Sequence, residues 1–208
     1  LYFSNFDKCV NLSLDGFGDF ASCAWGMYDN NSLVIDKKIY FPNSLGIFYQ
    51  AMTQFLGFKN YGDEYKVMGL SSYGEPKYVD KLSKLIFKDG EGFKLNLDYF
   101  IHHKEKILFI NDRGQAVYKN LYSKKIYELL GSERKKDDKI SKEHIDLAKS
   151  TQTIYEEIFF HILKNLHKKY SNDNLSLSGG CIMNSVANGK IFKNTSFKKI
   201  YISPNPGD

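Results

Sequence analysis

The residues of this sequence that could do chemistry gather in two glycine-rich stretches, one near each end of the 208-residue chain. In the second stretch, leucine alternates with serine over residues 175–178 as in a strand, Gly179 and Gly180 form a turn, and a helix follows. Glycines let an anion approach the backbone, and the N-terminus of a helix attracts it. The pattern predicts a phosphate site, although an ordinary tight turn would have the same residues.

The first stretch places a carboxylate in a flexible bend. It reads Asp15-Gly16-Phe17-Gly18-Asp19 and directly follows a predicted strand. Asp15 could face nucleotide phosphates, their metal ion or an acceptor hydroxyl, but aspartate is also a common turn residue that bonds to its own backbone. Asn184 leaves a similar choice open, because an asparagine in the first turn of a helix can bond either a nucleotide or the backbone.

Further candidates lie in the middle of the chain. Glu64 and Asp63 are possible general bases for a hydroxyl, which must come within about 3 Å of the base. Lys66 could neutralise a phosphate as a point charge, or it could be a solvated surface lysine. Asp98 is a weaker candidate base.

The elements that must position these residues begin with three strands. Residues 9–14, 22–28 and 33–41 have strand patterns, joined by the bend at 15–19 and by the hairpin turn Asp29-Asn30-Asn31. They predict a meander of three antiparallel strands. Residues 93–100 and 107–110 are expected to be short strands or extended loops, and residues 197–203 are expected to form the last strand.

Helical patterns fill the region between the two glycine stretches. Asn43 or Ser44 would cap a helix that runs to about residue 56, and residues 78–87 and 121–130 predict two shorter helices. Ser141 would cap the longest helix, which runs to about residue 170 and carries Phe159 on its apolar stripe. Residues 131–142 are charged and predict an exposed connection. The order of elements is that of an α/β protein.

Composition excludes several classes of protein. Hydrophobic residues make up 42% of the chain, enough for a packed core, and the net charge of +5 comes without a basic stripe of the kind that binds nucleic acid. No apolar run approaches the roughly 20 residues that span a membrane, and the first residues are not those of a signal peptide. Cys9, Cys23 and Cys181 form neither a disulfide framework nor a metal pattern. We expect a cytoplasmic protein with no nucleic-acid or membrane partner.

The histidines do not have the spacing of metal ligands. We expect all five to be structural or exposed: His102, His103, His144, His161 and His167.

Several motifs, taken together and in this order, resemble those of the O-carbamoyltransferases that act on nodulation factors and aminoglycoside antibiotics. The run at residues 62–70 is the most specific of them. The matching stretches, which span nearly the whole chain, are Ser4-Asn5-Phe6-Asp7, Leu12-Ser13-Leu14-Asp15-Gly16-Phe17-Gly18-Asp19, Ser44-Leu45-Gly46-Ile47-Phe48-Tyr49, Gly62-Asp63-Glu64-Tyr65-Lys66-Val67-Met68-Gly69-Leu70, Leu177-Ser178-Gly179-Gly180-Cys181-Ile182-Met183-Asn184 and Pro206-Gly207-Asp208.

The resemblance implies an RNase H-like lobe of the sugar kinase, Hsp70 and actin superfamily, an actin-like ATPase fold. In that family a second domain makes carbamoyl adenylate from carbamoyl phosphate and ATP, and the actin-like domain transfers the carbamoyl group to a hydroxyl. The acceptor would be a small molecule or a glycan, and a homodimer is an assembly that we consider. Because the chain lacks an initial Met and stops directly after a predicted strand, we expect residues 1–208 to be part of the actin-like domain, with the adenylate-forming domain after residue 208.

The resemblance also suggests roles for residues. Asp15, Glu64 and Asp98 are the expected catalytic candidates, and a divalent metal ion, often iron in the family, would be bound by Asp208 and by two histidines of an HxxxH motif expected upstream of residue 1. The residues expected to bind ATP or carbamoyl adenylate are Asp15, Gly16, Gly18, Lys66, Gly179, Gly180 and Asn184.

Two rival functions fit the same pattern. A sugar kinase of this architecture would use Asp15 as its base and would leave phosphate, not a carbamoyl group, on the acceptor. A non-catalytic regulatory module would bind adenine nucleotide tightly and transfer nothing.

Overall fold

The computed structural model describes residues 4–60, 62–110 and 116–204, and its contacts divide the chain into two compact units. Unit 1 contains the described residues of 1–46, 88–94 and 156–208, and unit 2 contains those of 47–87 and 95–155. Two helices, α1 (Leu45–Phe55) and α5 (Lys142–Tyr170), have residues in both units.

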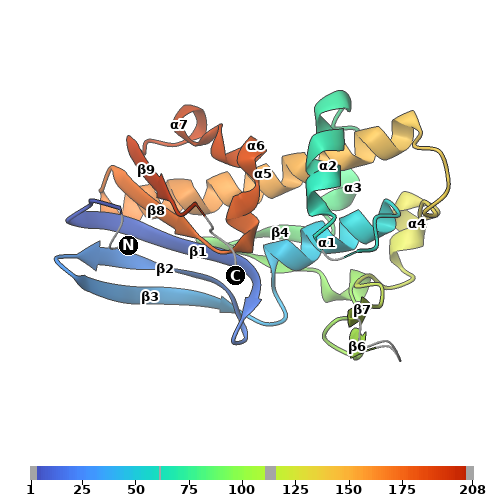
Figure 1. Ribbon diagram of the computed structural model, residues 1–208, viewed down its shortest axis with the longest axis horizontal. Helices are drawn as coiled ribbons and strands as arrows, with labels where there is room; N and C mark the ends of the chain where they lie inside the picture. Colours follow the sequence, from blue (N-terminus) through green and yellow to red (C-terminus); the bar gives the residue numbers. More distant parts are fainter. Residues whose placement is uncertain (1–3, 61, 111–115, 205–208) are drawn as a thin grey trace. The chain divides into compact units, whose positions relative to one another are not determined.

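Unit 1 is built on a five-stranded sheet with the order β3-β2-β1-β8-β9. The strands β1 (Lys8–Gly18), β2 (Ala21–Asp29) and β3 (Ser32–Tyr40) form the antiparallel meander, as predicted. The strand β8 (Asn174–Ser178) lies parallel to β1, and β9 (Lys199–Ile202) lies parallel to β8 (Figure 1). The chain is therefore a mixed α/β protein whose last two strands extend the sheet begun by the first three.

The bend predicted at residues 15–19 is wrong in position. Strand β1 continues to Gly18, and the pairing of β1 with β2 only becomes irregular between Leu14 and Gly18. The turn itself is made by Asp19 and Phe20, whose φ angles are +47° and +70°. Positive φ at both central residues is typical of a two-residue hairpin turn of type I′, so the chain reverses there and not at Asp15.

The core of unit 1 lies between the sheet and the second half of α5, which runs along the sheet in Figure 1. Leu12 and Trp25, paired across β1 and β2, are fully buried, and Phe159 and Ile162 of α5 are equally buried. This confirms the predicted inward face of the long helix. Burying a side chain of this kind contributes about 1.5–3 kcal/mol to stability.

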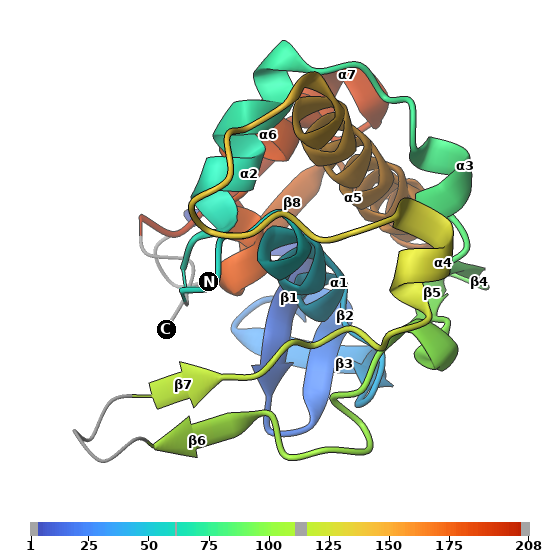
Figure 2. The same cartoon turned by 90° about the vertical axis from the view of Figure 1, so that its right-hand side faces the viewer.

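Unit 2 is mostly helical. It contains most of α1, the first half of α5, and three short helices, α2 (Glu64–Leu70), α3 (Val79–Leu82) and α4 (Ile126–Leu130). One two-stranded ribbon consists of β6 (Leu108–Ile110) and β7 (Ala116–Tyr118) (Figure 2), and 3-10 turns cover Ser71–Tyr73 and Leu97–Tyr99. A second ribbon, β4 (Ile86–Asp89) with β5 (Gly92–Leu95), has residues in both units. None of the helices in the described ranges is long and apolar enough to cross a membrane.

The core of unit 2 is centred on α1. Phe48, Met52 and Phe55 are buried on its predicted apolar face. The buried hydroxyl of Tyr49 donates a hydrogen bond to Oε1 of Gln152 on α5 at 2.9 Å, which satisfies two polar groups inside the unit.

Two predicted helices are much shorter than expected. The helix predicted at residues 78–87 is reduced to α3, because residues 86–89 form β4 and pair with β5. The helix predicted at residues 121–130 is reduced to α4, since Tyr122 is extended and forms a β-bridge with Phe100. Short apolar runs do not distinguish helix from strand, and in both cases pairing with a distant segment decided.

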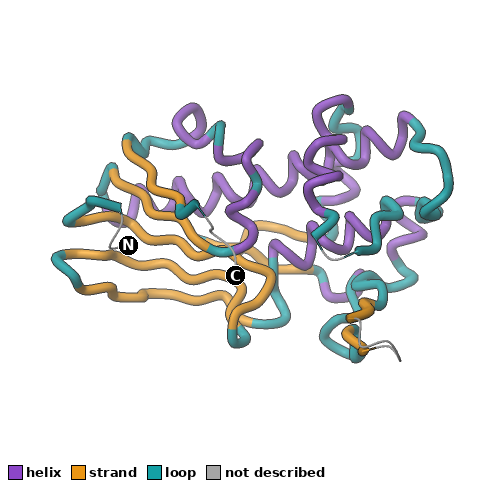
Figure 3. The backbone as a smooth tube through the Cα atoms, in the orientation of Figure 1, coloured by secondary structure: helices purple, strands orange, loops and turns teal. Residues whose placement is uncertain are grey.

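The helix predicted after the glycine pair is broken into short pieces (Figure 3). A 3-10 turn covers Gly180–Met183, and α6 (Ser185–Asn188) and α7 (Ile191–Asn194) follow. The break comes at Asn184, whose side chain accepts a hydrogen bond from the amide of Ala187 at 3.0 Å and so starts α6. The argument from a long helix dipole at Gly179–Gly180 is therefore wrong, while the argument from backbone access is unaffected.

Candidate functional site

The parallel pairing of β1 and β8 brings the two glycine-rich stretches together. In this register Ser13 lies opposite Ser178, the last pair of the two strands, so Asp15 of β1 lies just beyond the pairing, where the chain leaves β8 at Gly179. The carboxyl ends of neighbouring parallel strands are where open α/β sheets bind ligands. Residues more than 160 positions apart in sequence thus meet at the same end of two neighbouring strands.

The backbone at Gly179 admits only glycine. Its φ of +97° is unfavourable for any other residue, and a Cβ there would lie 2.3 Å from the backbone oxygen of Leu14. The chain leaving β8 therefore passes directly against the backbone of β1 at Leu14, and the next residue, Gly180, lies beside Asp15.

Gly180 faces the carboxylate of Asp15. A Cβ on Gly180 would lie 3.1 Å from Oδ1 of Asp15, so a side chain would push into this acid. The same Oδ1 accepts a hydrogen bond from the backbone amide of Gly16 at 2.7 Å, which orients the carboxylate. Asp15, Gly179 and Gly180 were all expected to bind the nucleotide. The structure brings the carboxylate of Asp15 close to this glycine pair.

Gly16 and Gly18 differ from the glycines of the second stretch. A Cβ built on either would meet no heavy atom of the described residues within 4 Å. Packing within unit 1 therefore does not require glycine at these two positions, and the space beside the carboxylate-bearing stretch is open.

Two residues at the start of α1 belong to the same site, although no role at a ligand site was predicted for them, and Ser44 was considered only as a helix cap. The hydroxyl of Ser44 donates to the backbone oxygen of Gly16 at 2.7 Å. A Cβ on Gly46 would lie 2.8 Å from Cα of Gly16 and 3.1 Å from Sγ of Cys181. The Ser44-Leu45-Gly46 motif was part of the family resemblance, and close packing against both glycine stretches is the physical reason for the small residue.

Asn184 has a structural role at this site. Its side chain caps α6, as described above, which matches the alternative reading of this residue as a backbone partner. Nucleotide binding by Asn184 stays a prediction.

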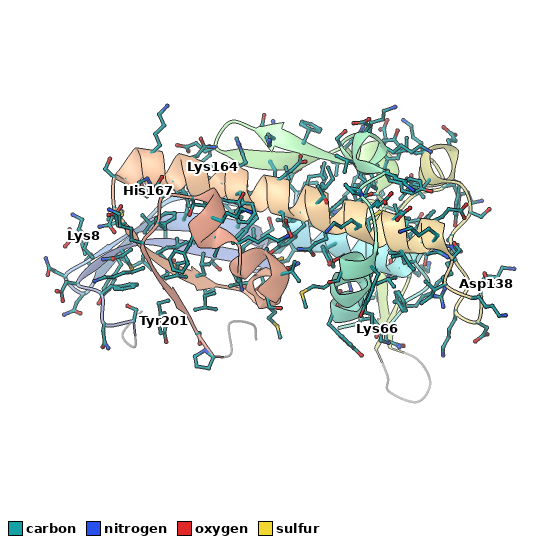
Figure 4. The ribbon with its side chains drawn as sticks, turned by 90° about the horizontal axis from the view of Figure 1, so that it is seen from above. Lys8, Lys66, Asp138, Lys164, His167 and Tyr201 are labelled. Carbon is teal, nitrogen blue, oxygen red and sulfur yellow. The ribbon has the colours of Figure 1, made fainter. Side chains whose placement is uncertain are left out.

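A second group of candidates lies on and beside α2 in unit 2. Lys66 forms an ion pair with Asp63, with Nζ 2.6 Å from Oδ1, and its ammonium group lies over the rings of Phe58 and Tyr65; Figure 4 labels this lysine. Asp63 is buried, and its other carboxylate oxygen accepts a hydrogen bond from the amide of Asn60 at 3.2 Å. Lys66 is partly exposed, and its ammonium group is already paired with the carboxylate of Asp63.

Glu64 is the candidate base of this group whose pKa is shifted. Burial raises the pKa of its carboxyl group, and the neighbouring Asp63 charge adds to the effect, against hydrogen bonds from the backbone that oppose it. A raised pKa brings a carboxylate closer to the range in which it exchanges protons at neutral pH.

Asp98 lies at the surface of unit 2. It forms an ion pair with Lys125 at 2.6 Å, and the hydrogen bond from this lysine lowers the pKa of Asp98. A carboxylate that is held ionised in this way is a weaker base. The structure thus groups Asp15, Gly16, Gly179 and Gly180 in unit 1, while Glu64, Lys66 and Asp98 belong to unit 2.

The expected metal ligand Asp208 lies outside the described residues. Within the described ranges, no group of three or more His, Cys, Asp or Glu side chains is placed to hold a metal ion. Three histidines make local bonds instead: His144 with Ser141, His161 with the backbone oxygen of Gly90, and His167, labelled in Figure 4, with Asp173 at 3.0 Å.

Comparison with known sequences identifies the class of protein in which this site occurs. The chain matches the family described as Carbamoyltransferase N-terminus over residues 1–208, and it belongs to that family. The family membership predicted from the motifs is thereby confirmed.

Several curated proteins match nearly the whole chain. The chain is 35% identical to the uncharacterised protein sll1178 of Synechocystis over 99% of its length. It is 30% identical to nodulation protein NolO of Bradyrhizobium diazoefficiens and 29% identical to nodulation protein NolNO of Sinorhizobium fredii, again over 99% of the chain. The match covers 32%, 33% and 27% of these proteins, so the chain spans about a third of the length of the curated relatives it matches.

Proposed function

We propose that this chain is the acceptor-modifying part of an O-carbamoyltransferase, which moves a carbamoyl group from carbamoyl adenylate to a hydroxyl. The observation that carries the proposal is the approach of Gly180 to the Asp15 carboxylate, with 3.1 Å from a Cβ position to Oδ1, in a chain of the carbamoyltransferase family. An acid and an accessible backbone at one point suit a reaction that involves both an anionic leaving group and a hydroxyl proton.

The proposed fold is an actin-like lobe. Support comes from the strand order β3-β2-β1-β8-β9, with an antiparallel meander first and two parallel strands after it. In this proposal residues 1–208 form part of an actin-like domain, and a separate domain supplies carbamoyl adenylate from carbamoyl phosphate and ATP.

The nucleotide would lie at Gly179 and Gly180, where the lack of side chains exposes the backbone to a phosphate. Gly16 and Gly18 leave the opposite side open. Because a carboxylate repels phosphate, Asp15 would either hold a cation between them or face the acceptor. Lys66 and Asn184 stay secondary candidates, since both already have partners in the structure.

For the transfer itself, Asp15 is the proposed base. It would accept the proton of the acceptor hydroxyl while the hydroxyl oxygen attacks the carbamoyl carbon, and AMP would leave with the electrons of the broken bond. Glu64 is the second candidate because its pKa is raised, and Asp98 is the third.

Iron or another divalent metal ion enters this proposal only through the resemblance, with Asp208 as one ligand. The described residues do not make up a metal site among themselves, so no step is assigned to the ion. In this proposal the described residues bind the nucleotide, orient the acceptor hydroxyl and accept its proton.

The test is the product formed by the full-length protein. With ATP, isotopically labelled carbamoyl phosphate and a hydroxylated acceptor, we expect AMP and an acceptor that carries the label, both detected by mass spectrometry. Asp15→Asn should reduce the rate of transfer at least about a hundredfold, the usual contribution of a general base. A phosphorylated acceptor would identify a kinase instead, and tight ATP binding without any product would identify a regulatory module.

A further inference from the structure

The stretch of backbone that carries Asp15 lies outside the regular pairing of the sheet. Strand β1 pairs with β2 as far as Leu14 and again at Gly18, and it pairs with β8 only as far as Ser13. Within the described part of the chain, neither register includes a pair for Asp15 or Gly16. A contact from outside these strands must therefore fix the direction of the Asp15 carboxylate.

Ser44 makes such a contact. Its hydroxyl donates to the backbone oxygen of Gly16 at 2.7 Å and shares its hydrogen with that of Asp15 at 3.3 Å. Ser44 is fully buried, so these bonds form away from water, where they are stronger. Both acceptors lie on the stretch that has no partner in the two registers.

The contact with Asp15 acts directly on the carboxylate. The carbonyl of Asp15 and the amide of Gly16 belong to one planar peptide group, and this amide donates to Oδ1 of Asp15 at 2.7 Å. A hydrogen bond that fixes the carbonyl therefore also fixes the amide. Ser44 thus holds the peptide group that orients the Asp15 carboxylate.

A role as the cap of α1 does not account for this contact. A capping serine accepts a hydrogen bond from a helix amide through the lone pairs of its oxygen. The hydroxyl has only one hydrogen to donate, and in Ser44 this hydrogen points to the backbone of β1. Donation towards Asp15 and Gly16 is therefore a separate function of the same side chain.

Two neighbouring contacts within unit 1 keep Ser44 in place. A Cβ on Gly46 would lie 2.8 Å from Cα of Gly16, so the start of α1 lies directly against this stretch. The buried hydroxyl of Ser22 donates to the backbone oxygen of Asn43 at 2.5 Å, which ties the residue before Ser44 to β2. The Ser44 hydroxyl therefore has a fixed position beside the stretch that carries the carboxylate.

We propose that Ser44 is a positioning residue, which holds the peptide group between Asp15 and Gly16 so that the Asp15 carboxylate faces the acceptor hydroxyl. This proposal rests on the function proposed above, in which Asp15 is the base. A base must come within about 3 Å of the proton that it accepts, so the direction of its carboxylate affects the rate. Ser44 itself is buried and acts only through Asp15.

The test uses Ser44→Ala in the full-length protein, with ATP, labelled carbamoyl phosphate and the acceptor that the wild-type protein carbamoylates. We expect kcat for transfer to fall about tenfold, because a misplacement on the order of 1 Å can cost about a hundredfold. The KM for the acceptor should not change, since buried Ser44 does not touch it. Hydrogen exchange of the Gly16 amide, followed by mass spectrometry, should become faster.

A double variant separates positioning from stability. Added to Asp15→Asn, Ser44→Ala should lower kcat no further, because the carboxylate through which Ser44 acts is already gone. A purely structural serine would lower kcat by the same factor in both backgrounds. Ser44→Gly removes the same hydroxyl but keeps a residue suited to a helix N-cap, so it should repeat the loss of kcat even where Ser44→Ala does not fold.

Ser22→Ala is the matched control. It also removes a buried hydroxyl that bonds to the backbone beside Ser44, but this hydroxyl does not contact Asp15 or Gly16. We expect a lower melting temperature with unchanged kcat and unchanged exchange at Gly16. An equal loss of kcat in Ser22→Ala would show that placing the segment before α1 is what matters, and it would overturn the proposal.

Other outcomes also decide. Unchanged kcat or unchanged exchange at Gly16 in the folded Ser44 variants overturns the proposal, as does an equal loss of kcat with and without the Asp15 carboxylate. If Asp15→Asn slows transfer and the Ser44 variants do not, only the positioning role is rejected. If Asp15→Asn leaves transfer unchanged, Asp15 is not the base, and the proposed roles of both residues are rejected together.

Discussion

The close approach of Gly180 to Asp15 is the most specific contact of the site. A side chain at residue 180 would fill the space between them and so test its role. Gly180→Val places methyl groups where a Cβ alone would already lie 3.1 Å from Oδ1 of Asp15. We expect affinity for a non-hydrolysable ATP analogue to fall about tenfold or more in the full-length protein, measured by calorimetry. Gly189→Ala is the control, because its Cβ would make only an ordinary contact of 3.4 Å with the backbone oxygen of Ser185. Unchanged affinity in a folded Gly180 variant would remove this glycine from the site.

A second single-residue prediction concerns Asp146 on α5, a buried carboxylate. It accepts a hydrogen bond from the amide of Glu75 at 2.8 Å and pairs with Lys142 at 3.0 Å and Lys77 at 3.2 Å. These contacts lower the pKa of Asp146 to about 2, the backbone hydrogen bond contributing most. The carboxylate therefore holds the loop around Glu75 against α5 within unit 2.

The pH dependence of stability follows from this shift. The folded pKa lies below the value of about 3.9 for an unfolded aspartate, so the stabilisation is complete above about pH 4 and is lost as the pH falls towards 2. Asp146→Asn should lower the urea midpoint clearly at pH 7, and the difference from wild type should shrink below pH 4. Asp89→Asn, which breaks an exposed pair with Lys94, should have little effect at any pH. A difference that stays constant from pH 7 to pH 2.5 would contradict this account.

At the scale of elements, α5 contributes buried side chains to both units. Phe159 is fully buried on the part of α5 that belongs to unit 1. Phe159→Ala should lower the free energy of unfolding by about 3–5 kcal/mol, because it removes a large buried ring and leaves a cavity.

The measurement for Phe159 is urea or thermal unfolding. Phe192→Ala is the control, since this phenylalanine on α7 is 60% exposed and its loss should change the unfolding free energy by about 0.5 kcal/mol or less. A melting temperature of Phe159→Ala within about one degree of wild type would show that α5 does not pack as described.

At the scale of the whole molecule, the chemistry that the family resemblance implies is divided between parts. The chain matches about a third of each curated relative, and the proposed source of carbamoyl adenylate lies outside residues 1–208. We therefore expect the 208-residue chain by itself to form no carbamoylated product from carbamoyl phosphate, ATP and acceptor. Product detected by mass spectrometry from the purified chain would require the whole reaction to be reassigned to these residues.

Much of the architecture could be predicted because it depends on local patterns. Alternation of apolar residues marked the strands of the meander, and the 3.6-residue period marked α1 and α5 together with the buried position of Phe159. Local patterns also identified Asp15 and the Gly179–Gly180 pair as candidates. An aspartate carries a carboxylate and a glycine exposes its backbone in any fold.

Only the tertiary structure decided which segments pair outside the predicted meander. Residues 86–89 became a strand because β5 pairs with them, and Tyr122 is extended because it bridges to Phe100. The facing of Gly180 and Asp15 depends on β1 and β8 lying side by side, and the place of Ser44 and Gly46 depends on their contacts with Gly16 and Cys181. A sequence pattern reports the preference of a short segment, whereas these contacts join segments far apart in the chain, where the gain from pairing and burial exceeds the local preference.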